Sequence, residues 1–317
     1  MKESEAQVEV ESVFSHPDEF MFLASSPRDQ RHILAATIKS EGGHRKLSTG
    51  LYILPLGSSG SLTRDCLFGD CSSLTNGMFW ESTENVVISD SEGPRMYRIG
   101  EDNPINTVKV PECSVSIDDP HHPFVVASGG NRSVHLWDSR TSSLSLTCKT
   151  SHFFPILSMD ANPNLEHVFM TGGADGRMMF WDIRGTSGDA IKTVDVHNHY
   201  VTSVKYNQLH DELVLSAGTD CAVNLWSVKS IASTPMKHEP LVEKPHPMSP
   251  KRKPASQPTV KEASRDGLIQ RYNRHEESIY RTCWAAGGST WLFGSVSYDG
   301  LVMFNSVPST EKYRIML

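Results

Sequence analysis

One tryptophan-containing segment recurs along this chain at a nearly constant spacing. The segment TGGADGRMMFWDIRG, residues 171–185, combines a Gly-rich acidic turn, a short apolar run and a Trp-Asp-x-Arg ending. A similar segment, ASGGNRSVHLWDSR, lies about one unit earlier, and SAGTDCAVNLWSV lies about one unit later. Their tryptophans, Trp137, Trp181 and Trp226, are 44 and 45 residues apart. Much of the chain is therefore a repeat of one unit.

The content of each unit predicts antiparallel strands. Short apolar or alternating runs, bounded by Gly, Asn, Asp and Pro, are typical of strands joined by tight turns. No segment keeps a helical period over three turns. A period in the forties, with a Gly-rich turn before a strand that ends in Trp-Asp, is typical of a four-stranded propeller blade. We therefore predict an all-β protein, a β-propeller that forms a single domain over residues 1–317.

Six complete units can be placed with the repeat as a ruler. Their approximate bounds are residues 19–71, 76–110, 113–151, 153–196, 200–272 and 278 to the end. In the first unit we expect a loop rich in Gly, Ser and Lys between the second and third strands, and a fourth strand around DCLFG, residues 65–69. In the sixth unit we expect the final KYRIML, residues 312–317, to be a strand.

One strand is left over at the start. VEVESVFSH, residues 8–16, ends in a histidine with Phe20 four places on, as the last strand of a blade does before the next blade begins. It is expected to be the outer strand of a blade whose three inner strands are absent. The protein is then either a six-bladed propeller with a spare N-terminal strand or a seven-bladed one lacking most of its first blade, because of the protein itself or of an incomplete gene model. The seven-bladed interpretation is favoured.

The fifth unit is interrupted between its third and fourth strands. Residues 230–266 contain seven prolines, the basic cluster PKRKP and almost no aliphatic side chains. Such a segment cannot bury enough apolar area to offset the entropy lost on ordering, so we predict a disordered surface insertion. PKRKP could serve nuclear import or contact an anionic surface, but a solvated linker is the favoured interpretation.

Histidine, hydroxyl, acidic and tryptophan residues recur at fixed positions and invite an active-site interpretation, because Ser or Thr, His and Asp together perform nucleophilic catalysis. However, the set returns in successive units, and an enzyme has no use for one triad per blade. We interpret it as a structural hydrogen-bond network that joins two loops to the strand below, because buried polar groups must be paired. Its predicted members are His152, Thr171, Asp175, Trp181, His197, Ser216, Asp220, Trp226, His275 and Asp299, with Asn305 replacing the tryptophan of the sixth unit.

Signatures of enzymes and cofactor sites are absent from the sequence. It contains no GxxxxGK[ST] phosphate loop, no HExxH and no GxSxG. We predict no enzymatic activity, no cofactor and no metal site, although His121-His122 and the pair His197 and His199 are candidates for a metal. The six cysteines include no CxxC pair and are expected to be buried, reduced thiols.

Charge and hydropathy narrow the class of partner. The net charge of −7 argues against general nucleic-acid binding, which needs a basic face. The start, MKESEAQVEVES, is polar and acidic, unlike a signal peptide. No apolar run approaches the roughly 20 residues of a membrane helix, so any membrane association is expected to be indirect.

Arg140 and Arg184 are the candidate partner-binding residues. Both follow a Trp-Asp by two positions in consecutive units, so they are expected side by side on one rim of the ring. Each could form an ion pair within its own blade, with Asp138 or Asp182, or could offer its guanidinium to a partner's carboxylates. The two roles are compatible, and the sequence does not choose between them.

The arrangement resembles the WD40 repeat family over essentially the whole chain. The segments HEESIY, SYDG and the terminal KYRIML, with HNHYVTSVKYNQLHDELVLSAGTD and SSPRDQRHILAAT, are more narrowly similar to the EARP and GARP complex-interacting protein family. That resemblance implies a seven-bladed, non-enzymatic adaptor that binds endosomal and Golgi-associated tethering complexes. It also implies a cytoplasmic protein, peripherally at the trans-Golgi network and endosomes, in endosomal recycling and retrograde traffic. The chain departs from the family in its mostly missing first blade and its basic rather than acidic insertion.

Two alternative functions use the same arginines. The successive WDSR and WDIR endings suit a substrate receptor of a cullin-RING ubiquitin ligase, whose propeller-shaped adaptor would be the partner. A histone-binding nuclear propeller would use these arginines together with PKRKP. Tethering subunits, ligase adaptors and histones are disjoint outcomes of an affinity purification, which is therefore the most informative experiment.

Overall fold

The computed structural model describes residues 10–15, 19–25, 32–41, 44–55, 77–80, 85–90, 93–98, 101, 103–107, 115–118, 120–121, 125–130, 132–138, 143–185, 189–233, 266–285 and 290–316. Within these residues the chain forms six antiparallel sheets, five with four strands and one with three. Each sheet uses strands that follow one another in sequence, except the last, which also recruits the first strand of the chain.

The elements repeat the same order in each sheet. The first sheet contains β2 (Glu19–Ser25), β3 (His32–Glu41) and β4 (His44–Pro55). The second contains β5 (Gly77–Trp80), β6 (Asn85–Asp90), β7 (Gly93–Arg98) and β8 (Asn106–Thr107). The third contains β9 (Val115–Asp118), β10 (Val125–Gly130), β11 (Ser133–Asp138) and β12 (Ser143–Lys149). The fourth contains β13 (Ile156–Ala161), β14 (Val168–Gly173), β15 (Arg177–Asp182) and β16 (Lys192–Asp195).

The last two sheets hold the remaining elements. The fifth contains β17 (Val201–Tyr206), β18 (Leu213–Gly218), β19 (Val223–Ser227) and β20 (Gly267–Tyr272). The sixth contains β21 (Ile279–Trp284), β22 (Leu292–Ser297), β23 (Leu301–Ser306) and β1 (Val10–Ser15). Two short helices accompany them, the 3-10 helix η1 (Lys229–Ile231) and the α-helix α1 (Ser309–Met316).

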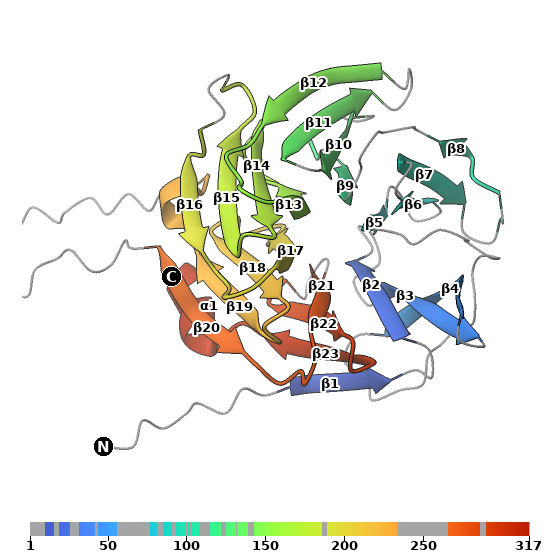
Figure 1. Cartoon of the computed structure of the whole chain (residues 1–317). Helices are drawn as coiled ribbons and strands as arrows, with labels where there is room; N and C mark the ends of the chain where they lie inside the picture. The colour runs from blue at the N-terminus through green and yellow to red at the C-terminus, as the bar shows by residue number, and fades with distance from the viewer. Residues whose placement is uncertain are drawn as a thin grey trace, which may run out of the picture.

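The six sheets form a ring, as the blades of a propeller do (Figure 1). The first strand of each sheet lies innermost, and each of these strands contacts the innermost strand of the next sheet, from β2 through β5, β9, β13 and β17 to β21. β21 in turn contacts β2, so the ring is closed. This arrangement confirms the β-propeller that the repeat predicts.

The hydrophobic core lies between neighbouring sheets. One cluster joins the third and fourth sheets, a second joins the fourth and fifth, and a third joins the fifth and sixth. Met170, Phe180 and Val204 of the second cluster are essentially inaccessible to solvent. Because each blade buries its apolar faces against its neighbours, a single blade has no complete core of its own.

The strand that the sequence leaves over completes the last sheet. β1 pairs antiparallel with β23, with Ser12 opposite Phe304 and Ser15 opposite Leu301. The outer edge of β23 is available because the chain turns into α1 after Ser306. The segment is therefore the fourth strand of the sixth sheet and not the outer strand of a further blade. Among the described residues, the ring closes with the six blades that the repeat places.

The prediction that KYRIML forms the fourth strand of the sixth unit is wrong, because its described residues lie in α1. Pro308 precedes the helix, and its carbonyl accepts hydrogen bonds from the backbone N–H groups of Glu311 and Lys312, at 3.0 and 3.1 Å. A proline at the start of a helix costs nothing, since that N–H has no helical partner. Ile315 packs against the cluster between the fifth and sixth sheets, so one apolar face of the helix is used.

The first unit also differs from the sequence prediction. The Gly-, Ser- and Lys-rich segment expected as a loop instead extends β3 and β4, which pair from His32 opposite Pro55 to Glu41 opposite His44. Antiparallel pairing is made by backbone groups, so it can continue where the side chains are polar. The strand expected around residues 65–69 lies outside the described residues.

In the fifth sheet, β19 and β20 are neighbours although β19 ends at Ser227 and β20 begins at Gly267. Most of the predicted insertion, residues 234–265, lies outside the described residues. Its flanks are joined, since the backbone N–H of Ser230 donates to Asp266 Oδ1 at 2.9 Å and Lys192 also bonds to Asp266. Among the described residues, no helix has the length and apolar content needed to cross a bilayer.

Candidate functional site

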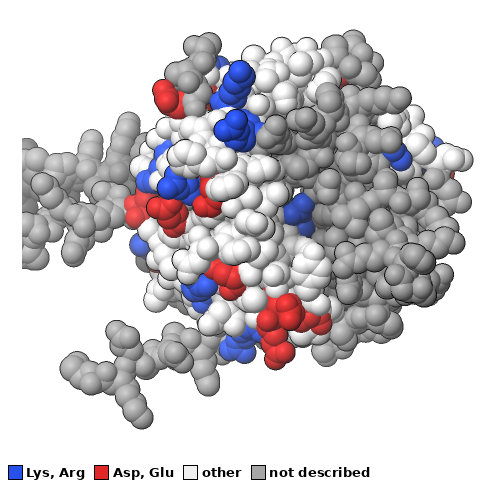
Figure 2. Space-filling view, viewed as in Figure 1, with Lys and Arg blue, Asp and Glu red and all other residues white. Residues whose placement is uncertain are grey.

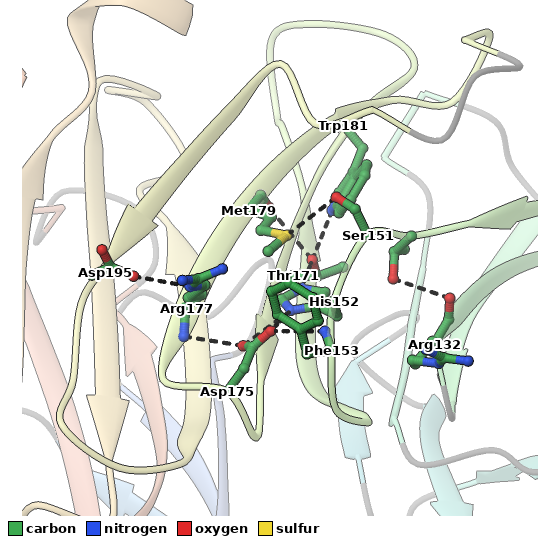
Figure 3. Close-up of polar contacts among 11 residues, drawn as sticks. Arg132, Ser151, His152, Phe153, Thr171, Asp175, Arg177, Met179, Trp181 and Asp195 are labelled. Atoms are coloured by element: carbon green, nitrogen blue, oxygen red, sulfur yellow. Dashed lines mark hydrogen bonds and ion pairs between the residues drawn. The ribbon is translucent and has the colours of Figure 1, made fainter.

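The fourth sheet brings together the four residues that the repeat singles out (Figure 3). His152 lies in the segment before β13, Thr171 in β14, Asp175 in the turn between β14 and β15, and Trp181 in β15. His152 Nδ1 is 2.9 Å from Asp175 Oδ2, and His152 Nε2 is 2.7 Å from Thr171 Oγ1. Trp181 Nε1 is 2.7 Å from the same hydroxyl oxygen. We call these four residues the fourth-sheet network.

The two end members of the network, Asp175 and Trp181, fix the direction of each hydrogen bond. A carboxylate only accepts, so His152 Nδ1–H donates to Asp175, and the indole N–H of Trp181 only donates, so Thr171 Oγ1 accepts from it. The Thr171 hydroxyl then donates to Nε2 of a neutral imidazole, and every group is satisfied. Burial lowers the pKa of His152, more than its bond to Asp175 raises it, which agrees with the neutral form.

The fifth sheet repeats the arrangement one unit later. His197 Nδ1 is 2.7 Å from Asp220 Oδ1, and Nε2 is 2.9 Å from Ser216 Oγ, which accepts the indole N–H of Trp226 at 3.0 Å. Arg271 on β20 adds a hydrogen bond of 3.0 Å to Asp220 Oδ2. Burial alone would raise the pKa of Asp220, but its bonds to His197 and Arg271 hold that pKa below the usual value.

The sixth sheet has the same histidine and acid but a different last member. His275 Nδ1 is 2.9 Å from Asp299 Oδ2, and Nε2 is 2.8 Å from Ser295 Oγ. Asn305 stands where the tryptophan would be, and its Oδ1 is buried without a hydrogen-bond partner among the described residues. Ser295 was missed in the sequence prediction, although it precedes Asp299 by four residues, as Thr171 precedes Asp175.

These networks are closed to substrates. Thr171, Ser216 and Ser295 have no exposed surface, and His152 is 2% exposed. Each histidine has both ring nitrogens engaged, one by the acid and one by the hydroxyl. A catalytic hydroxyl needs access to a reacting atom, so this geometry suits the joining of loops and strands better than chemistry on a bound molecule.

A second repeated contact, missed in the sequence prediction, links one blade to the next. Asn162 follows β13, accepts the backbone N–H groups of Asn164 and Leu165 at 2.8 Å, and donates to Asp211 of the fifth sheet at 3.2 Å. Asn207 follows β17 and donates to the carbonyl of Thr290 in the sixth sheet at 2.7 Å. The two asparagines are 45 residues apart, so the repeat period could have revealed them.

One cross-blade ion pair could not be read from the repeat. Asp160 in β13 accepts from Lys205 Nζ and from the backbone N–H of Tyr206 in β17, both at 2.8 Å. Burial raises the pKa of Asp160, and these bonds offset only part of that effect. The two side chains occupy equivalent positions of successive blades with opposite charges, so no periodic pattern marks the pair.

Of the two candidate partner-binding arginines, the structure describes Arg184 but not Arg140. Arg184 pairs with Asp182 of its own blade through Nε at 2.9 Å and Nη2 at 2.6 Å. This hydrogen-bonded pairing lowers the pKa of Asp182 and raises that of Arg184. The Arg184 side chain is still 67% exposed. Arg140 lies outside the described residues, so its place beside Arg184 stays a prediction.

The histidines considered for a metal bind other groups. His121 Nε2 is 2.9 Å from the carbonyl oxygen of Asn162, and His199 Nδ1 bonds to Thr219 Oγ1. His197 belongs to the fifth-sheet network, whereas His122 lies outside the described residues. In the part of the chain that the structure describes, no three His, Cys, Asp or Glu side chains gather as a metal site would require. Cys148, Cys221 and Cys283 are free thiols, and burial raises the pKa of Cys283 to about 12.

Known proteins match part of the chain. A family described as the EIPR1 beta-propeller matches residues 72–226. The EARP-interacting protein homolog of Gekko japonicus is 37% identical over 199 residues, which are 62% of this chain and 50% of that protein. EARP and GARP complex-interacting protein 1 of Homo sapiens is 35% identical over the same share of each chain. The chain thus spans about half the length of these curated relatives.

A third relative covers more of the chain at lower identity. WD repeat-containing protein DWA2 of Arabidopsis thaliana is 28% identical over 309 residues, which are 94% of this chain and 81% of that protein. Its name agrees with the ring of antiparallel sheets and with the recurring Trp-Asp. The chain is therefore a β-propeller whose sequence resembles a WD repeat-containing protein and the EARP and GARP complex-interacting proteins.

Proposed function

We propose that this chain is a non-enzymatic adaptor that binds the EARP and GARP vesicle-tethering complexes. It acts in endosomal recycling and in endosome-to-Golgi retrograde transport. The observation that carries the proposal is the match of residues 72–226 to the EIPR1 beta-propeller, together with relatives whose names state an interaction with EARP or with both complexes.

The geometry of the recurring polar residues supports a binding role over a catalytic one. Each His, Ser or Thr and Asp set is buried, internally satisfied and repeated in successive blades. We assign these sets to holding the loops of each blade in place. A propeller held in this way presents many loops on a rigid ring, which suits broad contacts with proteins.

The site of action follows from the proposed partners. The chain works in the cytoplasm, peripherally at the trans-Golgi network and endosomes, and reaches membranes through the tethering complexes. Imaging of the tagged chain before and after depletion of a tethering-complex subunit tests this point. The expected result is loss of the punctate endosomal and Golgi signal, and unchanged puncta would contradict recruitment through the complexes.

The decisive experiment is affinity purification of the tagged full chain followed by mass spectrometry. We expect subunits of the EARP and GARP complexes, with an unrelated tagged propeller as the control. Recovery of a cullin-RING ligase adaptor, abolished by Arg140→Ala with Arg184→Ala, would favour the ligase-receptor alternative. Recovery of histones would favour the nuclear alternative, and either result without tethering subunits would overturn the proposal.

A further inference from the structure

Four aromatic side chains are exposed where the chain enters and turns within three successive blades. Phe153 and Phe154, 68% and 57% exposed, lie just before β13. Tyr200, 47% exposed, directly precedes β17, and Tyr298, 44% exposed, directly follows β22. Large aromatic groups supply most of the binding energy at protein interfaces when a partner covers them. We call these four residues the aromatic surface.

Strand register places the aromatic surface at one end of the ring. The first strand of each blade begins opposite the end of the second, with Ile156 opposite Gly173, Val201 opposite Gly218 and Ile279 opposite Ser297. The segment before each first strand therefore lies beside the turn after the second strand. Phe153, Phe154, Tyr200 and Tyr298 all belong to these segments and turns. Because His152, His197 and His275 also lie there, we call it the histidine end.

Hydrogen bonds join the loops at the histidine end from blade to blade. The backbone N–H groups of Val196 and His197 donate to the carbonyl of Gly176, at 3.1 and 3.2 Å, which links the fourth and fifth blades. The backbone N–H of Thr219 donates to the carbonyl of Tyr200 at 3.1 Å. Ser278 Oγ donates to the Thr219 carbonyl at 3.3 Å. The aromatic surface is thus carried by one connected set of loops.

The buried networks hold this surface in place before any partner arrives. Phe153 N–H donates to Asp175 at 3.2 Å, and Glu276 N–H donates to Asp299 at 3.3 Å. Tyr298 N–H donates to the carbonyl of Ser278 at 3.1 Å. Loops that are already ordered lose less conformational entropy on binding, so the same contact area gives a higher affinity.

Two carboxylates beside the aromatic surface give it a local negative charge. Glu276 and Glu277 follow His275, are exposed, and form no ion pair among the described residues. By contrast, the nearby cations are already engaged, Arg177 by Asp195 at 3.0 Å and Arg271 by Asp220 at 3.0 Å. On the side seen in Figure 2, acidic and basic side chains of the described residues lie in small mixed groups. The two glutamates therefore favour a partner that places a positive charge at this surface.

We propose that the aromatic surface, with Glu276 and Glu277, is where the tethering complex docks. The docking element is a peptide segment that presents apolar side chains beside at least one Lys or Arg. The apolar groups cover Phe154, Tyr200 and their neighbours, and the cation pairs with the two glutamates. This inference rests on the proposed function for the identity of the partner, but the chemistry of the segment follows from the surface alone.

The first test compares matched variants of the full chain for binding to the purified tethering complexes. The apolar variant is Phe154→Ser with Tyr200→Ser, and the charge variant is Glu276→Lys with Glu277→Lys. Phe153 is left intact because Arg177 lies over its ring at 5.4 Å. The controls are Leu209→Ser, 63% exposed after β17, and Glu166→Lys before β14, both at the opposite end of the ring.

We expect each histidine-end variant to weaken binding at least tenfold, about 1.4 kcal/mol, and each control to bind as the unaltered chain does. Unchanged thermal unfolding midpoints would show that all variants are folded. Equal binding by every variant would overturn the inference and leave the proposed function intact. Absence of binding by the unaltered chain would instead overturn the proposed function.

The second test does not depend on the identity of the partner. Phage-displayed 12-residue peptides are selected on the unaltered chain and counter-selected on the apolar variant. We expect enrichment of peptides with apolar residues next to Lys or Arg, and their loss on the charge variant. Enrichment of acidic peptides, or peptides that bind both proteins equally, would overturn the inference.

Discussion

The hydroxyl oxygen of Thr171 joins the histidine and the tryptophan of the fourth-sheet network. It accepts the indole N–H of Trp181 and donates to His152 Nε2, with both distances at 2.7 Å. It has no exposed surface, so water cannot replace either partner. In a site of this kind, loss of one atom leaves two polar groups unpaired, which costs more than the bond itself contributes.

Thr171→Val is therefore expected to destabilise the protein strongly. The change keeps the shape of the side chain but removes the partner of both Trp181 and His152, so we expect a loss of about 2 to 5 kcal/mol in the free energy of unfolding. Thr171→Ser is the matched control, because it keeps the hydroxyl and loses one methyl group, at about 1 kcal/mol. Urea unfolding measures both. Equal stability of the two variants would contradict the role of the hydroxyl.

The lowered pKa of His152 predicts a loss of stability on acidification. The unfolded chain binds a proton near the ordinary histidine pKa of about 6.5, whereas the folded chain binds it only at lower pH. Between these values the unfolded state holds more protons, so the free energy of unfolding falls as pH falls below about 6.5 and levels off below the folded pKa. Unfolding of the protein and of His152→Gln at pH 7.5 and 5.5 measures this. A drop that is as large in the variant would count against His152 as its source.

At the scale of elements, the turns between the second and third strands of the fourth, fifth and sixth sheets differ in the residue that follows the aspartate. Gly176 and Gly300 adopt φ angles of 76° and 77°, and Cys221 stands at the equivalent position of the fifth sheet with φ 59°. Left-handed backbone costs a non-glycine residue about 1 to 2 kcal/mol. The cysteine gains little in return, since its sulfur makes one weak contact of 3.6 Å with the Glu276 carbonyl.

We expect Cys221→Gly to stabilise the protein by about 1 kcal/mol and Gly300→Ala to destabilise it by about the same amount. A Cβ added at Gly300 would meet no heavy atom within 4 Å, so its substitution isolates the backbone effect. Gly176→Ala should cost more, because the added Cβ would lie 2.6 Å from the His197 carbonyl oxygen. Thermal and urea unfolding of the three variants give the order. A destabilising Cys221→Gly would contradict the strain argument.

The joined flanks of the fifth-sheet interruption predict that the intervening residues are dispensable for folding. Ser230 and Asp266 already hold β19 and β20 together at the base. Replacing residues 234–265 with four Gly or Ser residues should change the free energy of unfolding by no more than about 2 kcal/mol, because the entropy of loop closure depends only weakly on loop length. Denaturant unfolding of the shortened chain is the measurement. A larger loss would show that the replaced residues contribute to the fold.

At the scale of the whole molecule, pairing of β1 with β23 is expected to hold the ring closed. Removing residues 1–15 would leave the outer edge of β23 unpaired, while removing residues 1–9 would retain β1. We expect the first deletion to lower the unfolding midpoint substantially and to broaden the transition, and the second to change it little. Circular dichroism during heating compares the two. Equal midpoints would contradict a closing role for β1.

The sequence predicts those features of the whole molecule that repeat. The period places the blades, and the same spacing assigns His152, Thr171, Asp175 and Trp181 to one blade. The asparagines after β13 and β17 obey the same period, and Ser295 keeps the four-residue spacing to the turn aspartate, so all three could have been found. The Asp160–Lys205 pair could not, because it depends on which residues of neighbouring blades face each other.

The ends of the chain show the limit of pattern reasoning. KYRIML alternates as a strand would, yet its described residues are helical, because a proline starts the helix and Ile315 finds apolar neighbours. The sequence predicts that β1 belongs to a blade whose other strands are absent, because nothing in the segment itself indicates pairing with β23, roughly 300 residues later. The two strands meet only when the ring closes, so their pairing produces no pattern in the sequence near either strand.

The pairing of β1 with β23 also sets the order in which the protein is completed. Val10 lies opposite Asn305, so roughly 300 residues separate the two halves of one sheet. A ribosome adds about 5 to 20 residues each second. Because β1 leaves the ribosome before β23, it must wait about 15 to 60 seconds for its partner strand. During that time it is exposed to chaperones and to edge strands of other nascent chains.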